Sequence, residues 1–279
     1  MKEFYTRSLT AVAYAAVLLF SLFYNQYLFY FVGFICSLIL VFEFIKLITD
    51  YNHNFLSIDS GKSNLILYLT FPLYIFLFLL SKNSTFQLIF LLIIILTNII
   101  LGFSLLKKKL FSFSILKNRF IGHFYLVGSL VIFFTMSNVT NSHNPLIVFS
   151  FLMLIWVSDS AAYVFGVNFG KRPLFKSVSP KKSVEGFLGG IIFSIILSLF
   201  FHKYLNIDFT IIQWLIIGLL TSSLGALGDL VQSQFKREAG VKDSGKFLPG
   251  HGGLYDRMDS IIFAAPFIYL TIKIFIYVS

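Results

Sequence analysis

The stretch "FQLIFLLIIILTNIILGFSLL", residues 86–106, contains no charged side chain. A helix rises 1.5 Å per residue, so about 20 apolar residues cover the hydrocarbon core of a bilayer. A strand of a membrane barrel would be about ten residues long and would alternate between polar and apolar side chains. The stretch is 21 residues long and does not alternate in this way. It therefore predicts a transmembrane helix.

Similar apolar runs recur along the whole chain, which is 57% hydrophobic and 12% charged with a mean hydropathy of +0.86. Soluble domains carry about a quarter charged residues, so the composition predicts an all-α polytopic integral membrane protein. Hydropathy predicts about nine spans, at 7–24, 27–47, 64–80, 86–106, 121–138, 145–168, 185–203, 209–232 and 260–278. We expect residues 1–140 to form a scaffold of membrane helices and residues 141–279 to carry the polar, functional loops.

The basic residues predict the orientation of these spans. If the N-terminus is cytoplasmic, 19 of the 22 Lys and Arg residues fall in or beside cytoplasmic segments, the others being Lys82, Lys203 and Lys273. Cytoplasmic loops carry an excess of Lys and Arg, so a cytoplasmic N-terminus is favoured. The net charge of +10 then reflects these loops and anionic lipid headgroups, with no need for nucleic acid as a partner.

One acidic residue, Asp159, lies inside the sixth predicted span, in "WVSDSAAYVFG" (156–166). A carboxylate in an apolar helix costs about 2.5–3.5 kcal/mol on insertion scales, so it needs a partner, water or a function. A structural ion pair with a loop lysine is the alternative to a role in a binding site.

The next polar cluster is "GKRPLFKSVSPKKSVEGFLGG", residues 170–190. Ser179 before Pro180 predicts a helix N-cap followed by the first helical residue. Lys181 and Lys182 would then oppose the helix dipole unless an anion lay beside them, which favours a phosphate site. Simple membrane anchoring remains the alternative for the other basic residues, Lys171, Arg172 and Lys176. A small helix face is predicted at Gly186, Gly189 and Gly190.

A third cluster begins in "SSLGALGDLVQSQFKR", residues 222–237. The spacing of Asp229, Ser233 and Lys236 places them on one helix face. Gly225 and Gly228 leave room there for a neighbouring helix or a ligand.

The segment "KREAGVKDSGKFLPGHGGLYDRMD", residues 236–259, mixes acids, bases and glycines. Its carboxylates and that of Asp229 are hard oxygen ligands of the type that Mg²⁺ selects, whereas its basic side chains suit phosphate oxygens. The pattern indicates a metal–polyphosphate site. The aspartates are Asp243, Asp256 and Asp259, beside one glutamate, Glu238, and the bases are Lys236, Arg237, Lys242, Lys246 and Arg257. For His251 a phosphate or backbone hydrogen bond is favoured over a role as catalytic base.

The residues of 233–259, "SxFKRxxxxKDxGxxLPGHGGxxDRxD", resemble the signature of the phosphatidate cytidylyltransferases, also called CDP-diacylglycerol synthases. "DSAAY" (159–163), "SPKKSVEGFLGG" (179–190) and "GDLVQS" (228–233) resemble upstream motifs of the same family. Ser183 stands where many members have Thr, which keeps the hydroxyl. The resemblance is close over about 150–265, and the first five spans match in hydropathy alone.

The resemblance implies a Mg²⁺-dependent reaction of CTP with phosphatidic acid at the cytoplasmic face of a bacterial-type inner membrane. It implies Asp229 and Asp256 as principal metal ligands, Asp259 and Asp243 as second choices, and Lys236 and Arg257 beside them as catalytic. Substrate binding is then expected from Lys181, Lys182, Ser183, Ser233, Arg237, Lys242, His251 and Asp159. A second cation and a homodimer are compatible with the resemblance.

Two other classes of membrane protein fit the sequence less well. A transporter or Mg²⁺ channel would use Asp159 and Asp229 as ion sites, but it predicts acids spread across the bilayer rather than gathered among bases at one face. A CDP-alcohol phosphotransferase is also membranous and metal-dependent. Its spacing of Asp residues with DG and AR dipeptides is absent from this sequence.

Overall fold

The protein is described by a computed structural model that covers residues 2–53, 73–74, 84–107, 118, 120–140, 142–250 and 252–278. Within these ranges the chain is helical apart from one short hairpin and the connecting loops. The elements are α1 (Lys2–Tyr24), α2 (Gln26–His53), α4 (Ser84–Lys107), η1 (Ile121–Gly128), α6 (Ser129–Thr135), η2 (Met136–Asn138), α7 (Pro145–Phe169), β1 (Pro173–Phe175), β2 (Ser179–Ser183), α8 (Val184–Tyr204), α9 (Ile211–Glu238) and α10 (Tyr255–Val278).

Seven segments of the described chain are long and apolar enough to cross a membrane, and a shorter apolar helix covers Leu9–Tyr24. They coincide with eight of the nine predicted spans, which confirms an α-helical polytopic membrane fold. The span expected at 121–138 consists of a π-helical, an α-helical and a 3₁₀ piece, η1, α6 and η2. The span expected at 64–80 lies outside the described residues, apart from 73–74.

Several helices begin at residues with well-defined capping interactions. Asn144 precedes Pro145, and its side chain accepts a hydrogen bond from the backbone N–H of Leu146. Thr210 and Gln213 form a reciprocal capping box at the start of α9. Such side chains satisfy backbone N–H groups that have no partner inside the helix. The starts of α7 and α9 are therefore specified locally by the sequence.

The start of α8 differs from the prediction. Ser179 is not an N-cap, and Pro180, Lys181 and Lys182 are not helical: all four lie in β2, which pairs with β1 in an antiparallel hairpin. The helix begins at Val184, and the N-cap is Ser183, whose Oγ accepts from the N–H of Gly186 at 3.1 Å. Lys181 and Lys182 thus project from a strand of the hairpin and do not belong to the first turn of a helix.

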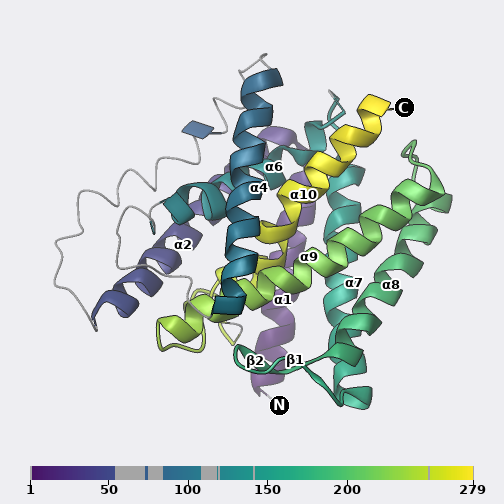
Figure 1. Ribbon diagram of the computed structural model, residues 1–279. Coiled ribbons are helices and arrows are strands. Elements are labelled where there is room, and N and C mark those ends of the chain that lie inside the picture. The colour runs from purple at the N-terminus through teal and green to yellow at the C-terminus, as the bar shows by residue number, and fades with distance from the viewer. Residues whose placement is uncertain are drawn as a thin grey trace.

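Small residues allow two close helix pairs. A Cβ added at Gly186, Gly189 or Gly190 would meet the backbone or side chains of α7, and one at Gly228 would meet the Asp259 carbonyl and Phe263 of α10. Helix α8 therefore lies against α7, and α9 against α10, as Figure 1 shows. Close backbone approach through small residues is typical of helix packing in membranes.

The distribution of side chains around α8 fits a lipid environment. Leu188, Ile192 and Ile196 are exposed, whereas Ser194 and Ser198 are buried. Ser194 Oγ donates to the carbonyl of Gly218 on α9 at 2.8 Å. Apolar side chains outside and hydrogen-bonded hydroxyls inside are the arrangement expected when lipid is the solvent.

The polar elements gather at one end of the bundle. In Figure 1 the N-terminus and the β1–β2 hairpin lie at the lower end, while the C-terminus lies at the upper end. Helix α9 crosses the bundle obliquely, and the irregular segment 239–254 connects it to α10. The glycine-rich loop that the sequence predicted is thus present, although α10 begins at Tyr255 rather than near residue 260.

Candidate functional site

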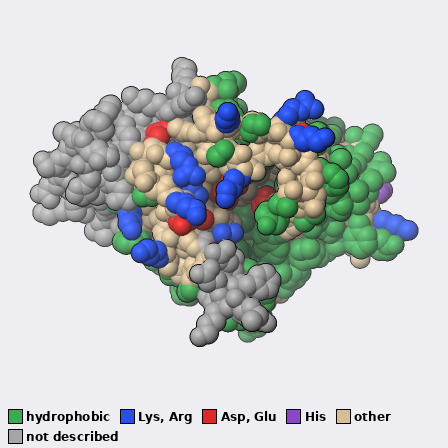
Figure 2. Space-filling model, turned by 90° about the horizontal axis from the view of Figure 1, so that it is seen from below, with side chains coloured by type: hydrophobic (Ala, Val, Ile, Leu, Met, Phe, Trp, Pro, Cys, Tyr) green, Lys and Arg blue, Asp and Glu red, His purple; other side chains and the backbone are tan. Residues whose placement is uncertain are grey.

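A cavity of about 1250 Å³ opens at the end that carries the hairpin. Residues of α1, α7, β2, α8, α9, α10 and the 239–254 loop line it. Figure 2 views this end and shows Lys and Arg side chains around a hollow in which acidic side chains are visible. The cavity therefore combines segments from both halves of the chain.

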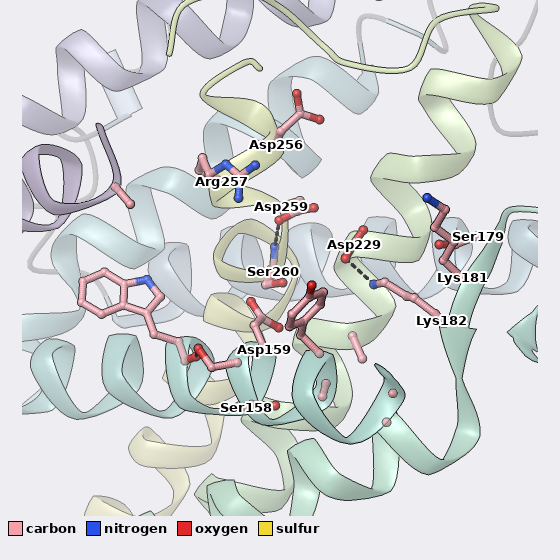
Figure 3. Close-up of a pocket in the computed structure, with 18 of the residues that line it drawn as sticks. Ser158, Asp159, Ser179, Lys181, Lys182, Asp229, Asp256, Arg257, Asp259 and Ser260 are labelled. Atoms are coloured by element: carbon pink, nitrogen blue, oxygen red, sulfur yellow. Dashed lines mark hydrogen bonds and ion pairs between the residues drawn. The ribbon is translucent and has the colours of Figure 1, made fainter. Parts of the chain in front are cut away.

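Three carboxylates from different helices face the cavity. Asp159 comes from α7, Asp229 from α9 and Asp259 from α10, and Figure 3 shows them pointing toward a common space. Asp259 is buried and its Oδ1 accepts from the N–H of Ser260 at 2.8 Å. Like charges this close repel one another, so the cluster favours a cation or a basic group in its centre.

Asp229 already has one such basic partner. Its Oδ2 is ion-paired with Lys182 Nζ from β2, and its Oδ1 accepts from Ser233 Oγ at 3.1 Å. The side chains of Lys182 and Asp229 are 29% and 35% exposed, so both stay accessible from the cavity. The predicted shared face of Asp229, Ser233 and Lys236 on α9 is confirmed, although Lys236 takes a different partner.

Asp256, by contrast, lines the cavity but has several hydrogen-bond donors of the protein around it. Its Oδ1 accepts from Lys236 Nζ and Gln232 Nε2, each at 2.7 Å. Its Oδ2 accepts from the N–H groups of Ser244 and Gly253 at 3.0 and 2.9 Å, and contacts Ser244 Oγ at 3.1 Å. Only 7% of its side chain is exposed. The Asp256 carboxylate, at the start of α10, therefore connects the 239–254 loop with the end of α9.

The glycine-rich loop brings further polar groups to the cavity. Asp243 is exposed and lines it, next to Gly252. Gly252 has a φ of +84°, a backbone conformation that residues other than glycine rarely adopt. His251 lies outside the described residues, so its predicted hydrogen bond is not described.

The predicted phosphate-binding bases divide into two groups. Those that line the cavity are Lys181, Lys182, Lys236 and Arg257, together with the hydroxyl of Ser183. Arg237 and Lys242 are exposed and are not among the lining residues; Arg237 Nε donates to the Val178 carbonyl of the hairpin at 3.5 Å. Of the anchoring candidates, Arg172 is paired with Glu185 at 3.6 Å.

The donor set fits Mg²⁺, although the described residues contain no group of three or more His, Cys, Asp or Glu side chains close enough to hold a metal by themselves. Mg²⁺ is usually bound by one or two protein carboxylates together with substrate phosphates, so a complete protein cage is not required. Two or three carboxylates facing a cavity that also contains lysines match that requirement.

One wall of the cavity is apolar. It consists of residues of α1, α7 and α8 such as Val12, Ala15, Trp156, Val167 and Phe187. The N-terminal helix also contacts the glycine-rich loop, because Thr10 Oγ1 donates to the Pro249 carbonyl at 3.4 Å. The cavity thus offers charged groups at one part and a hydrocarbon-like surface at another.

Sequence reasoning missed three residues of this region. Gln232 and Ser244 hold Asp256, and Glu43 of α2 accepts hydrogen bonds from the same loop. Glu43 carried a usable signal, since an acid inside a predicted membrane span is a functional candidate by default. Gln232 lies in the motif "GDLVQS", but the sequence did not indicate that it or Ser244 would contact Asp256, because these contacts are made only in the folded chain.

Fold and cavity together define a polytopic α-helical membrane protein with an acidic and basic cleft beside an apolar wall. The model of the cytidylyltransferase family matches residues 5–275, and the chain therefore belongs to that family.

Curated relatives are similar over part of their length. The phosphatidate cytidylyltransferase of Staphylococcus saprophyticus is 42% identical over 175 residues, which are 60% of this chain and 63% of that protein. The Bacillus subtilis protein of the same name is 37% identical over 177 residues, 63% of this chain and 65% of that protein. A Staphylococcus aureus protein so named is 41% identical over 170 residues, again 60% and 63%. The chain thus matches less than two thirds of the length of these relatives.

Proposed function

We propose that the chain is a CTP:phosphatidate cytidylyltransferase, which makes CDP-diacylglycerol and pyrophosphate from CTP and phosphatidic acid. The observation that carries the proposal is the cavity, where carboxylates and lysines lie beside an apolar wall at one end of a membrane bundle. A soluble triphosphate and a lipid phosphate need such a mixed surface to meet. Membership of the cytidylyltransferase family and the names of the relatives support the same reaction.

In this reaction an oxygen of the lipid phosphate forms a bond to the α-phosphorus of CTP, and the bond between the α-phosphorus and the bridging oxygen breaks to release pyrophosphate. The attacking oxygen is already anionic near neutral pH, so no strong general base is required. The main barrier is the approach of one anion to another. Positioned cations lower it by stabilising the charge that develops in the transition state.

We assign the lining bases to this task. Lys181 and Lys182 of β2 would hold the triphosphate together with Lys236, Arg257 and the hydroxyl of Ser183, all of which line the cavity. Ser233 is not among the lining residues; its hydroxyl donates to Asp229 and would act by orienting that carboxylate. Arg237 and Lys242, outside the lining, would act from the rim. Charge-assisted hydrogen bonds of this type are about twice as strong as neutral ones.

Mg²⁺ is the proposed cofactor, with Asp229 and Asp256 as its principal ligands and with Asp259, Asp243 and Asp159 near them. When bound, it would neutralise phosphate charge and orient the α-phosphate for displacement. Asp229 reaches the cavity with Lys182 as its partner, whereas Asp256 would have to share its Oδ1 between the cation and Lys236. A second cation is part of the same proposal.

We further propose nine spans with a cytoplasmic N-terminus, in a bacterial-type inner membrane, with the cavity at the cytoplasmic face. The concentration of the N-terminus, the hairpin and the basic side chains at one end supports this orientation. Residues 1–140 would act as scaffold and 141–279 would carry catalysis, with α1 contributing to the apolar wall. A homodimer is proposed from the family resemblance.

The experiment is a transfer assay with purified full-length protein in detergent micelles. It contains CTP labelled in the cytosine base, phosphatidic acid and Mg²⁺, and it measures organic-soluble label. We expect labelled lipid that requires both phosphatidic acid and Mg²⁺, and none when diacylglycerol replaces phosphatidic acid. A folded preparation that yields no labelled lipid under these conditions rejects the proposal.

A further inference from the structure

Glu43 is a buried carboxylate on α2 that lies far in sequence from the loop it contacts. Its side chain is 2% exposed. It accepts hydrogen bonds from the N–H groups of Leu254 and Tyr255 at 3.0 and 2.9 Å and from Ser244 Oγ at 3.1 Å. A charged group within a membrane helix is costly, so these donors account for its presence there.

Two glycines of the loop make room for Glu43. A Cβ added at Gly245 or at Gly253 would overlap the Glu43 carboxylate. The backbone of the loop can therefore approach the carboxylate only where no side chain intervenes. These two glycines serve a contact inside the protein, whereas the positive-φ Gly252 shapes the turn that faces the cavity.

Ser244 connects Glu43 with the candidate site. Its Oγ lies 3.1 Å from Glu43 Oε2 and 3.1 Å from Asp256 Oδ2, and its N–H donates to the same Asp256 oxygen at 3.0 Å. Asp256 in turn accepts from Lys236, which lines the cavity. A continuous series of contacts thus runs from α2 through the loop to α9.

We propose that Glu43 is a positioning residue for the cytidylyl transfer site, acting through Ser244 and the first residues of α10 on Asp256 and Lys236. The proposal rests on the proposed function for its effect on turnover, but the contacts themselves do not depend on it. Glu43 does not line the cavity of about 1250 Å³ that forms the candidate site, so it acts by fixing geometry and not by touching substrate. Displacements of about 1 Å at a reacting centre are enough to cost about 100-fold in rate.

The decisive variant is Glu43→Gln. It keeps the size of the side chain but places an amide NH₂ opposite backbone N–H donors, so one hydrogen bond is lost and one contact becomes repulsive. We expect kcat to fall about 10- to 100-fold, the range typical of residues that orient primary ligands. The KM for CTP should change far less. Glu43→Asp, which keeps the charge, should recover part of kcat.

Hydrogen exchange supplies a readout that does not require activity. In Glu43→Gln the amides of Leu254 and Tyr255 should exchange faster than in the wild type, while peptides of α7 and α8 should be unchanged. If the wild type had no transferase activity, the proposed function would fail, and exchange would still show whether Glu43 holds the loop. Unchanged exchange at Leu254 and Tyr255 overturns the positioning proposal.

A matched control is available in Asn98 of α4. Its buried Nδ2 donates to the Phe263 carbonyl at 3.2 Å. Asn98 therefore connects α4 with α10, the helix that follows the loop, but it does not contact the loop itself. Asn98→Ala should lower the melting temperature without slowing turnover per folded molecule. If Glu43→Gln lowers activity only in proportion to the folded fraction, as expected of the control, Glu43 has no positioning role.

Ser244→Ala keeps the test usable if Glu43→Gln does not fold. It removes the hydroxyl link but leaves the backbone donors to Glu43 and Asp256. We expect a smaller loss of kcat than for Glu43→Gln, and in the double variant with Glu43→Asp a loss well below the product of the two single losses, because both act through one link. Fully multiplicative losses would overturn the route through Ser244.

Discussion

Asp229 and Asp256 are both acids of the same polar end, yet their surroundings differ. Asp256 is 7% exposed and accepts hydrogen bonds from four residues, two on α9 (Gln232 and Lys236) and two in the 239–254 loop (Ser244 and Gly253). Asp229 is 35% exposed and has two side-chain partners, Lys182 and Ser233. Asp256 fixes the loop to both helices as well as lining the cavity, whereas Asp229 is the more accessible of the two to a ligand.

The largest effect is expected from Asp256→Asn, which would break the fixed half of this comparison. The amide would face the N–H groups of Ser244 and Gly253 and would leave Lys236 without a charge partner. We expect turnover to fall at least about 100-fold. Removal of one member of a buried ion pair should also lower stability, on the order of 3 kcal/mol. The transfer assay and thermal unfolding of the same preparation measure both, and retained turnover would remove Asp256 from the site.

Asp229→Asn should lower turnover without a comparable loss of stability. Turnover should again fall at least about 100-fold, because the open carboxylate would hold the cation and orient Lys182. Stability should change by less than about 1 kcal/mol, since a partly exposed ion pair contributes little. Melting curves beside the assay check this. A destabilisation as large as that of Asp256→Asn would erase the distinction between the two acids.

Lys182→Met tests the partner of the open acid. Loss of a charge-assisted contact to a phosphate is expected to raise the KM for CTP about 10-fold or more. Lys176 is the matched control: it is exposed in the turn of the same hairpin and does not line the cavity. Initial rates over a CTP series decide the matter. Equal changes in Lys182→Met and Lys176→Met would indicate a general effect of surface charge.

The smallest effect on turnover is expected from a change in the helix packing that places Asp229 opposite Asp259. In Gly228→Ala the new methyl group would meet the Asp259 carbonyl and Phe263, so we expect a loss of about 1–3 kcal/mol in stability. Gly225→Ala is the control, because its Cβ would lie 3.5 Å from Ser260 Cβ, an ordinary contact. Thermal unfolding should rank the two. Equal melting temperatures would mean that α9 and α10 adjust freely.

Local sequence patterns predicted the fold and much of the site. Apolar length placed the described spans, and the mixture of acids, bases and glycines marked the 239–254 loop and both helices beside it. Competition between two local patterns explains the failure at 179–182. Ser-Pro favours a helix start, but strand pairing of Phe175 with Ser179 and of Pro173 with Ser183 holds this segment in the hairpin.

Contacts between distant segments could not be predicted from one sequence. The role of Glu43 depends on a loop whose backbone reaches α2 only after the helices have packed. Gln232 lies within the predicted span, but it donates to Asp256 only because α9 and α10 pack with these two residues facing each other. In both cases the residue type indicated a polar contact, and the tertiary structure determined the partner.

The position of the label in the lipid product tests cytidylyl transfer most directly. Purified protein is given phosphatidic acid, Mg²⁺ and CTP labelled either at the α- or at the γ-phosphorus. The account predicts that α-label enters the lipid and that γ-label appears in pyrophosphate, in equal amounts. Entry of γ-label into the lipid would indicate phosphoryl transfer and would contradict the account, as would the absence of either product.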